Sequence, residues 1–316
     1  MTQGEPDVLD VAAGVILDPS GDILIARRAD HLHQGGLWEF PGGKLELGET
    51  PRQALERELF EELAIRVEEA SPLITLTHDY SDRRVCLHVW RVERFSGTPR
   101  GMQDQPIAWV PKSSLADFSF PAANRPIVTA ARLPDRYAIL DLPSGREQDF
   151  LESIEAYADR GIDMIRLRAS GLPGNYYAML AYLAAGLCKD RGISLLLNAS
   201  APLLRATGAA GLHLRSDELM SLAERPVGPE CWVAASCHDE MQLQHASQIG
   251  VDFAVLGPVL ATATHPEARP LGWEKFAQMV RLSTVPVFAL GGLSEQHLIQ
   301  AKRLGAQGIS AIRGLL

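Results

Sequence analysis

Cysteine is scarce in this chain, which has 4 cysteines among 316 residues. No C-x-x-C pair occurs among Cys86, Cys188, Cys231 and Cys237. The opening stretch MTQGEPDVLD has neither the basic nor the apolar region of a signal peptide. These absences argue against a secreted, disulfide-bonded protein, so we expect a reduced, cytoplasmic one.

Long apolar runs and an excess of positive charge are also missing. No apolar stretch approaches the roughly 20 residues that a membrane-spanning helix requires. The net charge of −9 and the pI near 5.5 argue against broad binding to a nucleic-acid backbone, which requires a basic surface. We therefore expect a protein that binds neither membranes nor polymeric nucleic acid.

What is present indicates a globular α/β protein with two domains. Hydrophobic residues make up 46% of the chain, enough for ordinary cores, and 316 residues exceed the usual size of one domain. Apolar runs that predict a mixed sheet with few helices occupy residues 11–17, 22–27, 85–92 and 107–110. Beyond residue 134, short apolar runs alternate with amphipathic helical stretches. The predicted domains are therefore 1–132 and 136–316.

A helix is predicted to begin at Thr50. Thr50 is a good N-cap, Pro51 suits the first helical position, and Gln53 completes a T-x-x-Q capping box. Apolar residues recur at spacings of three and four and form the expected buried stripe: Ala54, Leu55, Leu59 and Leu63.

Three carboxylates converge on one side of this helix. Glu58, Glu61 and Glu62 stand at positions i, i+3 and i+4, so their like charges repel one another. A hard divalent cation, most plausibly Mg²⁺ with Mn²⁺ as a substitute, would remove this repulsion and bridge to phosphate oxygens. On spacing alone, a solvated acidic helix face is the alternative.

The residues around these carboxylates resemble the Nudix box, G-x5-E-x7-R-E-U-x-E-E-x-G-U, where U is aliphatic. The matching positions are Gly43, Glu49, Arg57, Glu58, Leu59, Glu61, Glu62 and Ile65. Ala64 stands where the pattern has glycine, and we expect an altered turn at a small cost. The resemblance implies an α/β/α sandwich that hydrolyses a nucleoside diphosphate linked to another group, with Arg57 orienting a glutamate. The implied metal ligands are Glu58, Glu61, Glu62 and the carbonyl of Gly42.

Over about residues 8–130 the first domain resembles the MutT-like Nudix hydrolases, which remove oxidised guanine nucleotides. The shared stretches include ILIARRAD, WEFPGGK, GETP and FPAANRPI. The resemblance implies hydrolysis of 8-oxo-dGTP to 8-oxo-dGMP and diphosphate. The implied contacts are Arg28 to the nucleotide, Phe40 against the base, Lys44 near phosphate, and Asp82, Arg83 and Asn124 in the base pocket.

Asn124 carries the hypothesis on specificity. Oxidised guanine has an N7–H donor where guanine has an acceptor, and an Asn amide can accept from N7–H while donating to O6. Such mismatches at buried polar sites discriminate by factors on the order of 10⁴. The alternatives are a turn or capping role for Asn124 and a core position for Phe40.

One loop departs from the MutT-like pattern. Where these relatives carry a further acid before the Q-P-x-x-W segment, this chain has Gln103, with Asp104 beside it. Asp104 is the candidate for an additional metal ligand. If it does not serve, we expect a lower rate and intact metal binding by the helix.

The second domain shows eight candidate strands with helical patterns between them, which predicts a TIM barrel with its function in the loops after the strands. The strands are residues 137–142, 163–168, 193–198, 211–214, 231–236, 252–257, 285–290 and 308–312. Gly291 and Gly292 after the seventh strand and Ser310 in the eighth fit a phosphate site, with tight turns as the alternative.

This domain resembles thiamine phosphate synthase and the related thiazole tautomerase over about residues 136–314, which implies a phosphorylated, thiazole-like ligand. The shared stretches include IRLR, GLHLRSDEL, AASCH and PVFALGG. His238 stands at the catalytic histidine of the tautomerase, and a structural histidine at a strand end is the alternative. Synthase groups for Mg²⁺ and diphosphate are replaced by Asn198-Ala199-Ser200, Arg215-Ser216 and His265. Synthase activity is therefore not expected.

The chain ends soon after the eighth strand, so we expect the barrel to lack its last helix. Apolar surface left there should be covered by the first domain or by a second subunit, as in a homodimer.

Three functions compete. The first is a MutT-like hydrolase of 8-oxo-dGTP that cleans the nucleotide pool, beside a degenerate or ligand-sensing barrel. The second is a thiamine-pathway enzyme that hydrolyses a pyrimidine diphosphate and binds a thiazole phosphate. The third is a regulatory module that senses a phosphorylated ligand. The predicted base-pocket residues favour the first.

Overall fold

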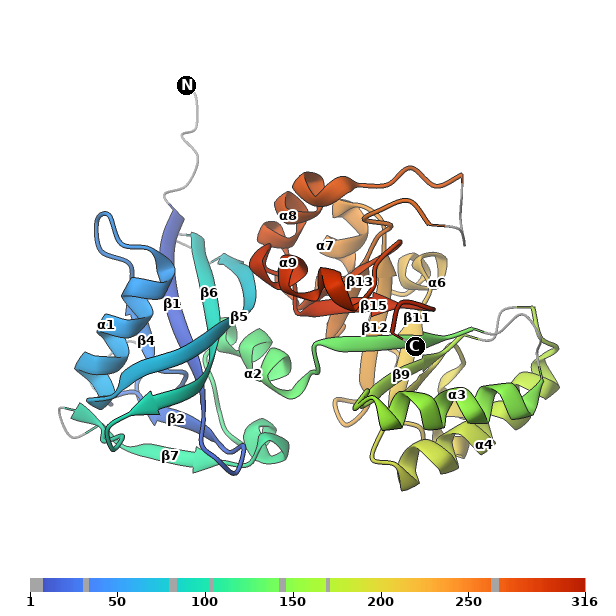
Figure 1. Cartoon of the computed structure of the whole chain (residues 1–316), viewed down its shortest axis with the longest axis horizontal. Helices are drawn as coiled ribbons and strands as arrows, with labels where there is room; N and C mark the ends of the chain where they lie inside the picture. Colours follow the sequence, from blue (N-terminus) through green and yellow to red (C-terminus); the bar gives the residue numbers. More distant parts are fainter. Residues whose placement is uncertain are drawn as a thin grey trace. The chain divides into compact units, whose positions relative to one another are not determined.

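The computed structural model describes residues 8–30, 34–79, 84–102, 105–141, 146–168, 171–262 and 267–315. The chain divides into two compact units between Leu133 and Pro134 (Figure 1). Among the helices in the described ranges, none has the length and apolar character needed to cross a bilayer.

The N-terminal unit is built on a seven-stranded mixed sheet. Its main order is β3-β2-β1-β6-β5, with β4 paired to β1 and β7 paired to β2. The β1–β6 pair is parallel and the other pairs are antiparallel. The strands are β1 (Val8–Leu17), β2 (Ile23–Arg27), β3 (Trp38–Glu39), β4 (Gly42–Lys44), β5 (Arg66–Asp79), β6 (Arg84–Ser96) and β7 (Ile107–Val110).

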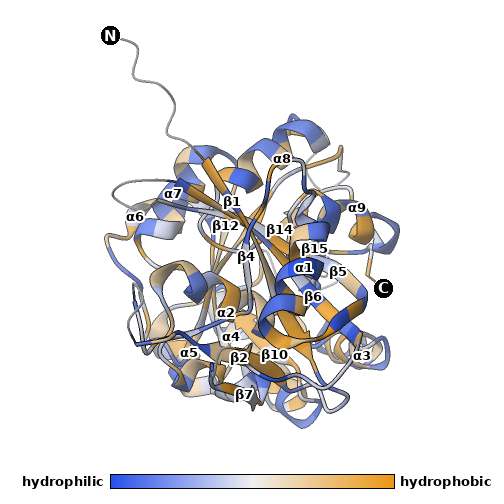
Figure 2. Cartoon of the chain, turned by 90° about the vertical axis from the view of Figure 1, so that its left-hand side faces the viewer, coloured by the Kyte–Doolittle hydropathy of each residue, from blue (hydrophilic) through white to orange (hydrophobic). Residues whose placement is uncertain are grey.

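Two helices cover opposite faces of this sheet. Alternate residues of a strand point to opposite faces. On β1, Ala12 and Ile16 pack with the buried residues of α1 (Pro51–Leu63), whereas Ala13 packs with those of α2 (Arg125–Arg132). Figure 2 shows the result as orange, hydrophobic strands with blue, hydrophilic bands along α1. The predicted α/β/α sandwich with a mixed sheet is confirmed.

The sequence patterns do not predict β5, although it is 14 residues long. Its pairing with β6 shifts register between Val67 and Glu69, between Glu69 and Ala70, and between Pro72 and Ile74. Each shift reverses the in-out alternation of side chains, which is the signal that identifies a strand in a sequence.

The C-terminal unit is a closed, parallel barrel of eight strands in the order β8-β9-β10-β11-β12-β13-β14-β15, closed by the β15–β8 pair. All eight predicted strands are present. They are β8 (Arg136–Leu140), β9 (Met164–Leu167), β10 (Ser194–Leu197), β11 (Gly211–Leu214), β12 (Trp232–Cys237), β13 (Phe253–Leu256), β14 (Val287–Leu290) and β15 (Gly308–Ala311).

Helices follow the strands around the barrel, as (β/α) repetition requires. Within the described residues no helix follows β15. The helices are α3 (Glu147–Asp159), α4 (Gly174–Asp190), α5 (Ala201–Thr207), α6 (Ser216–Ser221), α7 (Glu240–Gln248), α8 (Gly272–Leu282) and α9 (Leu298–Arg303).

Aromatic rings fill the barrel interior. Tyr137, Phe253 and Phe288 are fully buried, and the ring centroid of Phe253 lies 5.3 Å from each of the other two. Because the interior is filled by side chains, a ligand can bind only at the ends of the strands.

Candidate functional site

The ends of α1 are fixed by local hydrogen bonds. Thr50 and Gln53 form the predicted capping box, in which each side chain accepts a hydrogen bond from the backbone of the other. After Leu63 the helix stops at Ala64, which adopts the left-handed conformation with φ 57°. This is the conformation that glycine takes most readily, so alanine costs about 1 kcal/mol there.

Arg57 connects four oxygen-bearing groups beside α1. Its guanidinium donates to both carboxylate oxygens of Glu49 at 2.9 Å, to Glu58 Oε1 at 2.9 Å and to the carbonyl of Lys44 at 2.9 Å. It also lies 3.4 Å from Glu61 Oε2. The hydrogen bonds from Arg57 lower the pKa of Glu49 to about 2, and those carboxylates raise the pKa of Arg57. The arginine therefore stays charged and holds Glu58 and Glu61 on the same side of the helix.

Glu62 faces Gly42, the first residue of β4. Its Oε2 accepts a hydrogen bond from the Gly42 N–H at 3.0 Å. Burial raises the pKa of Glu62 to about 7 against the lowering effect of that hydrogen bond, and the carboxylates of Glu39 and Glu58 add to the rise. At Gly43, a Cβ atom would overlap the carboxylate of Glu58. The site thus concentrates negative charge that a bound cation would stabilise.

Glu39 is a fourth carboxylate that sequence reasoning missed. It lies at the end of β3, forms an ion pair with Arg28, and accepts from Gln105 Nε2 at 3.4 Å. Burial raises its pKa despite the charge of Arg28. The available signal was an acidic residue inside the apolar stretch WEFPGG, whose side chain could be buried only beside a cation.

The predicted nucleotide-binding residues are Arg28, Phe40 and Asn124, and their contacts meet at residues 39 and 40, just before β4. Arg28, the residue after β2, reaches Glu39, whereas Arg27 at the end of β2 contacts Asp30 at 3.0 Å, so the two side chains diverge. Phe40 is buried and stacks on another core ring. Asn124 Oδ1 accepts from the Phe40 N–H at 3.3 Å and makes no capping bond at the start of α2.

The remaining predictions for this unit differ in outcome. The backbone carbonyl of Lys44 accepts a hydrogen bond from Arg57, and Lys44 is an exposed residue. Asp82, Arg83 and Asp104 lie outside the described residues, as does His265 in the barrel.

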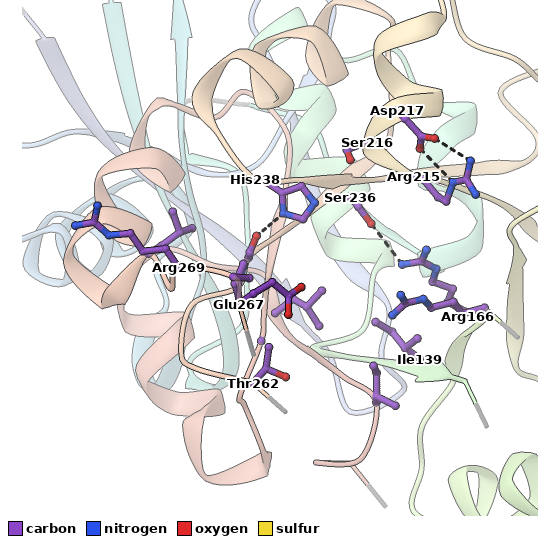
Figure 3. A pocket seen from close by; sticks show the side chains of 18 residues that line it. Ile139, Arg166, Arg215, Ser216, Asp217, Ser236, His238, Thr262, Glu267 and Arg269 are labelled. Atoms are coloured by element: carbon purple, nitrogen blue, oxygen red, sulfur yellow. Dashed lines mark hydrogen bonds and ion pairs between the residues drawn. The ribbon is translucent and has the colours of Figure 1, made fainter. Parts of the chain in front are cut away.

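In the barrel, the C-terminal ends of the strands surround a cavity of about 570 Å³. Figure 3 shows its polar side chains. The basic groups that line it are Arg166, Arg168, Arg215, Arg269 and His238, and the acidic ones are Asp217 and Glu267. The excess of arginine suits an anionic ligand.

Arg166 is held by a buried polar network that sequence reasoning also missed. It is 5% exposed, donates to Asn198 Oδ1 at 2.7 Å and lies 3.4 Å from Ser236 Oγ (Figure 3). Burial lowers its pKa to about 10. His213, fully buried, bonds through Nε2 to Ser236 Oγ at 2.8 Å and through Nδ1 to the Tyr137 hydroxyl at 2.9 Å. Burial lowers the pKa of His213 well below its usual value, so its ring is neutral.

His238 also lines this cavity. Its Nδ1 lies 2.6 Å from the Gly257 carbonyl (Figure 3). Because a carbonyl can only accept, Nδ1 carries the proton, and Nε2 of the neutral ring can act as a base.

A smaller cavity of about 170 Å³ lies at the loops after β14 and β15. Gly291 and Gly292 border it with φ values of 101° and 68°, and a Cβ on either would overlap the loop from Pro258 to Ala261. Ser310 borders it too, but its buried hydroxyl donates to the Tyr137 carbonyl at 2.8 Å. A phosphate contact would therefore come from the glycine backbone more readily than from the Ser310 side chain.

Comparison with known proteins finds a matching family for each of the two domains. A family model described as "NUDIX domain" matches residues 12–130, and one described as "Thiamine monophosphate synthase" matches residues 136–315. The "8-oxo-dGTP diphosphatase" of Escherichia coli K12 is 42% identical over 120 residues, which cover 38% of this chain and 93% of that protein. The chain belongs to the Nudix family and to the thiamine monophosphate synthase family.

Each half has further relatives. The "CTP pyrophosphohydrolase" of Escherichia coli K12 is 36% identical to the Nudix domain over 123 residues, which cover 39% of this chain and 90% of that protein. The "Putative thiamine-phosphate synthase 2" of Aquifex aeolicus is 32% identical to the barrel over 180 residues, which cover 57% of this chain and 96% of that protein.

The Nudix domain is a hydrolase domain, and Nudix hydrolases use a divalent metal. The carboxylates that converge on Arg57 and Gly42 suit such an ion because hard cations prefer oxygen ligands. The barrel belongs to a family that binds phosphorylated ligands, and its two adjoining cavities are large enough for one.

Proposed function

We propose that the Nudix domain hydrolyses 8-oxo-dGTP to 8-oxo-dGMP and diphosphate with Mg²⁺, for which Mn²⁺ can substitute. The observation that carries this proposal is the amide of Asn124, which binds the N–H of Phe40, two residues before the Gly42 N–H that binds Glu62 of α1. The identity of 42% to a protein named 8-oxo-dGTP diphosphatase supports the same substrate.

The carboxylate cluster fits a hard cation by its donors and by its charge. The proposed ligands are Glu58, Glu61, Glu62 and the carbonyl of Gly42. Burial and neighbouring carboxylates raise the pKa of Glu62 to about 7, so the ionised form is costly until a positive charge arrives. A bound Mg²⁺ would neutralise phosphate charge and lower the pKa of a water molecule.

The residues of the cluster take separate roles in this proposal. Arg57 stays charged and orients the carboxylate of Glu58 through a hydrogen bond of 2.9 Å. Glu61 has a side chain that is 58% exposed, so an attacking water can reach its carboxylate and give up a proton to it. Arg28 can leave Glu39 for the nucleotide, since a phosphate or a base carbonyl offers the guanidinium an equivalent acceptor.

Specificity for the oxidised base follows from how Asn124 is oriented. A backbone N–H can only donate, so the Phe40 N–H fixes Oδ1 as the atom that faces it at 3.3 Å. A carboxamide oxygen has a second lone pair, which can accept from N7–H of 8-oxoguanine while Nδ2 donates to O6. Guanine would place its N7 lone pair against that oxygen and lose the contact.

A hydrolysis panel tests the proposal. We expect wild-type protein with Mg²⁺ to prefer 8-oxo-dGTP over dGTP, CTP and hydroxymethylpyrimidine diphosphate, and chelation to abolish turnover. Glu61→Gln should lower kcat by about 10²-fold or more. Asn124→Ala should reduce the 8-oxo-dGTP to dGTP ratio of kcat/KM by about 10²-fold, with dGTP turnover little changed. A preference for CTP or the pyrimidine diphosphate would overturn the choice of substrate.

For the barrel we propose binding of a phosphorylated, thiazole-like ligand, with the phosphate at Gly291 and Gly292 and the ring in the larger cavity near His238. The adjoining cavities at these residues favour this function. Calorimetric titration with hydroxyethylthiazole phosphate should show binding that Gly292→Ala weakens by about 10-fold or more, because a Cβ there overlaps the Ala261 carbonyl. Equal binding of inorganic phosphate alone would refute a ring pocket.

A further inference from the structure

A second cluster of ligand atoms lies in the Nudix domain and shares no residue with the glutamates of α1. His88 Nε2 is 2.8 Å from Asp10 Oδ1 and 3.7 Å from Cys86 Sγ. The three ligand atoms all lie within 4.8 Å of one another. Carboxylate, imidazole and thiol together are a donor set that neither proposed function uses.

Strand register explains why these residues meet. β1 and β6 pair in parallel, with Asp10 opposite Cys86 and Ala12 opposite His88. Residues two apart on a strand share a face, so all three side chains lie on the face of the sheet to which Ala12 belongs. Positions 10 and 88 are 78 residues apart in the chain, and only this pairing brings them together.

We propose that Asp10, Cys86 and His88 bind one Zn²⁺ ion, with water as the fourth ligand. Zn²⁺ takes sulfur at about 2.3 Å and nitrogen or oxygen at about 2.0–2.2 Å in tetrahedral geometry, which places ligand atoms roughly 3.3–3.7 Å apart. The observed Nε2 to Sγ distance of 3.7 Å meets this spacing. The Nε2 to Oδ1 distance of 2.8 Å is that of a hydrogen bond. On binding, the Cys86 thiol would release its proton to solvent, and the neutral His88 ring would carry its proton on Nδ1 so that Nε2 can bind the ion. A small rotation of Asp10 would open the gap.

Burial across the cluster suits a site with one open position. Cys86 is 3% exposed, whereas the side chain of His88 is 20% exposed and that of Asp10 is 43% exposed. An ion and its water can therefore enter past Asp10, while the thiolate stays protected from oxidants.

The chemistry of this cluster separates it from the catalytic carboxylates. The glutamates of α1 offer only oxygen, which suits Mg²⁺, while thiolate and imidazole favour Zn²⁺. The two sites also involve different strands that pair with β1. Glu62 contacts Gly42 of β4, whereas Asp10 of β1 and His88 of β6 form the new site. Zinc at the new site would fasten the parallel pair at the centre of the sheet.

Cobalt titration of the full chain in excess Mg²⁺ tests the proposal. Co²⁺ bound to a thiolate gives a near-ultraviolet charge-transfer absorption, which wild-type protein should show at about one equivalent. Cys86→Ser should abolish the absorption, and Cys231→Ser in the barrel should retain it. Competition with a chromophoric chelator should show Zn²⁺ affinity lowered by about 100-fold in His88→Gln, since even the loss of an outer partner costs 10–100-fold.

Two further measurements separate loss of the zinc site from loss of the fold and from loss of hydrolysis. If Cys86→Ser folds poorly, Asp10→Asn at the exposed end should still weaken Zn²⁺ by about 10-fold or more with an unchanged circular dichroism spectrum. Hydrolysis of 8-oxo-dGTP by Asp10→Asn should match wild type, so a failed zinc site and a failed hydrolase assignment are distinguishable. Absence of the cobalt absorption in folded wild type, or its persistence in Cys86→Ser, would overturn the site and leave a hydrogen bond beside a packed thiol.

Discussion

At the residue scale, one arginine organises the proposed active site. Arg57 makes two hydrogen bonds to Glu49 and one to Glu58, and it also lies 3.4 Å from Glu61. Bidentate pairs of this kind fix direction as well as charge. In the proposed mechanism, Glu49 is therefore a positioning residue that acts through Arg57.

Glu49→Gln should lower kcat for 8-oxo-dGTP by roughly 10–10²-fold with little change in KM, because small displacements of catalytic groups are costly. Glu56→Gln is the matched control, since Glu56 pairs with Arg52 at 2.7 Å and has a side chain that is 46% exposed. Steady-state kinetics of both variants measure the difference. Equal kcat values would show that the Glu49 pair does not position the site.

Burial of His213 makes the barrel sensitive to acid. The folded pKa lies below the unfolded value of about 6.5, so below that pH the unfolded chain takes up a proton that the folded barrel does not. Stability is full above about pH 6.5 and falls as the pH drops, with a slope of at most about 1.4 kcal/mol per pH unit from this residue. Hydrogen exchange of β11 at pH 5–8 should show this decline, and His213→Gln should flatten it. If stability fell with pH at the same slope in wild type and in His213→Gln, His213 would not be the source of the acid sensitivity.

At the element scale, α1 shows which features are local. Its start is encoded by Thr50, Pro51 and Gln53, and all three take the expected positions. Its end departs from the Nudix pattern at Ala64, yet the chain keeps the left-handed turn and the Ala64 N–H bonds the carbonyls of Leu59 and Phe60. The surrounding contacts therefore hold a residue in a conformation that its side chain disfavours.

Ala64→Gly should stabilise the Nudix domain by about 1 kcal/mol, because glycine reaches φ 57° without the Cβ penalty. For a domain of this size the melting temperature should rise by about 4 °C. Differential scanning calorimetry measures the rise, with the Nudix transition identified by its response to Mg²⁺. Ala158→Gly is the control, since it lies within the last turn of α3 and should be destabilising. No rise in Ala64→Gly would mean that the turn is not strained.

At the scale of the whole molecule, each proposed site is built within one unit. The glutamates of α1, the loop at Gly42 and the anchored Asn124 all precede the division between Leu133 and Pro134. The cavities at the strand ends belong wholly to the barrel. All of the proposed catalytic groups of the hydrolase therefore come from the N-terminal unit.

Residues 1–133 expressed alone should keep kcat/KM for 8-oxo-dGTP within about threefold of the full chain, a difference of about 0.6 kcal/mol in transition-state stabilisation. Parallel assays of the two proteins at the same Mg²⁺ concentration measure the ratio. A loss of 10-fold or more in a folded fragment would show that the barrel contributes to hydrolysis.

The sequence by itself determined the elements and groups that short-range patterns encode. The start of α1, the clustering of its glutamates and the eight barrel strands all follow from spacings within a few residues, and each strand was predicted to within a few residues of its ends. In the first domain, β5 was not predicted because its register shifts break the two-residue alternation. β3 and β4 were not predicted because strands of 2 and 3 residues are too short to show a period. The eight strand-helix repeats predicted the barrel fold, and family resemblance, carried by the motifs, supplied the hydrolase class.

Only the tertiary structure decided which distant groups meet. Asn124 lies 84 positions after Phe40 and His88 lies 78 after Asp10, so no local spacing predicts their contacts. The ion pair of Glu39 and the network around Arg166 likewise depend on burial, which forces polar groups to find partners wherever the packing places them. Periodicity reports the face on which a residue lies, whereas strand register decides which residue it faces.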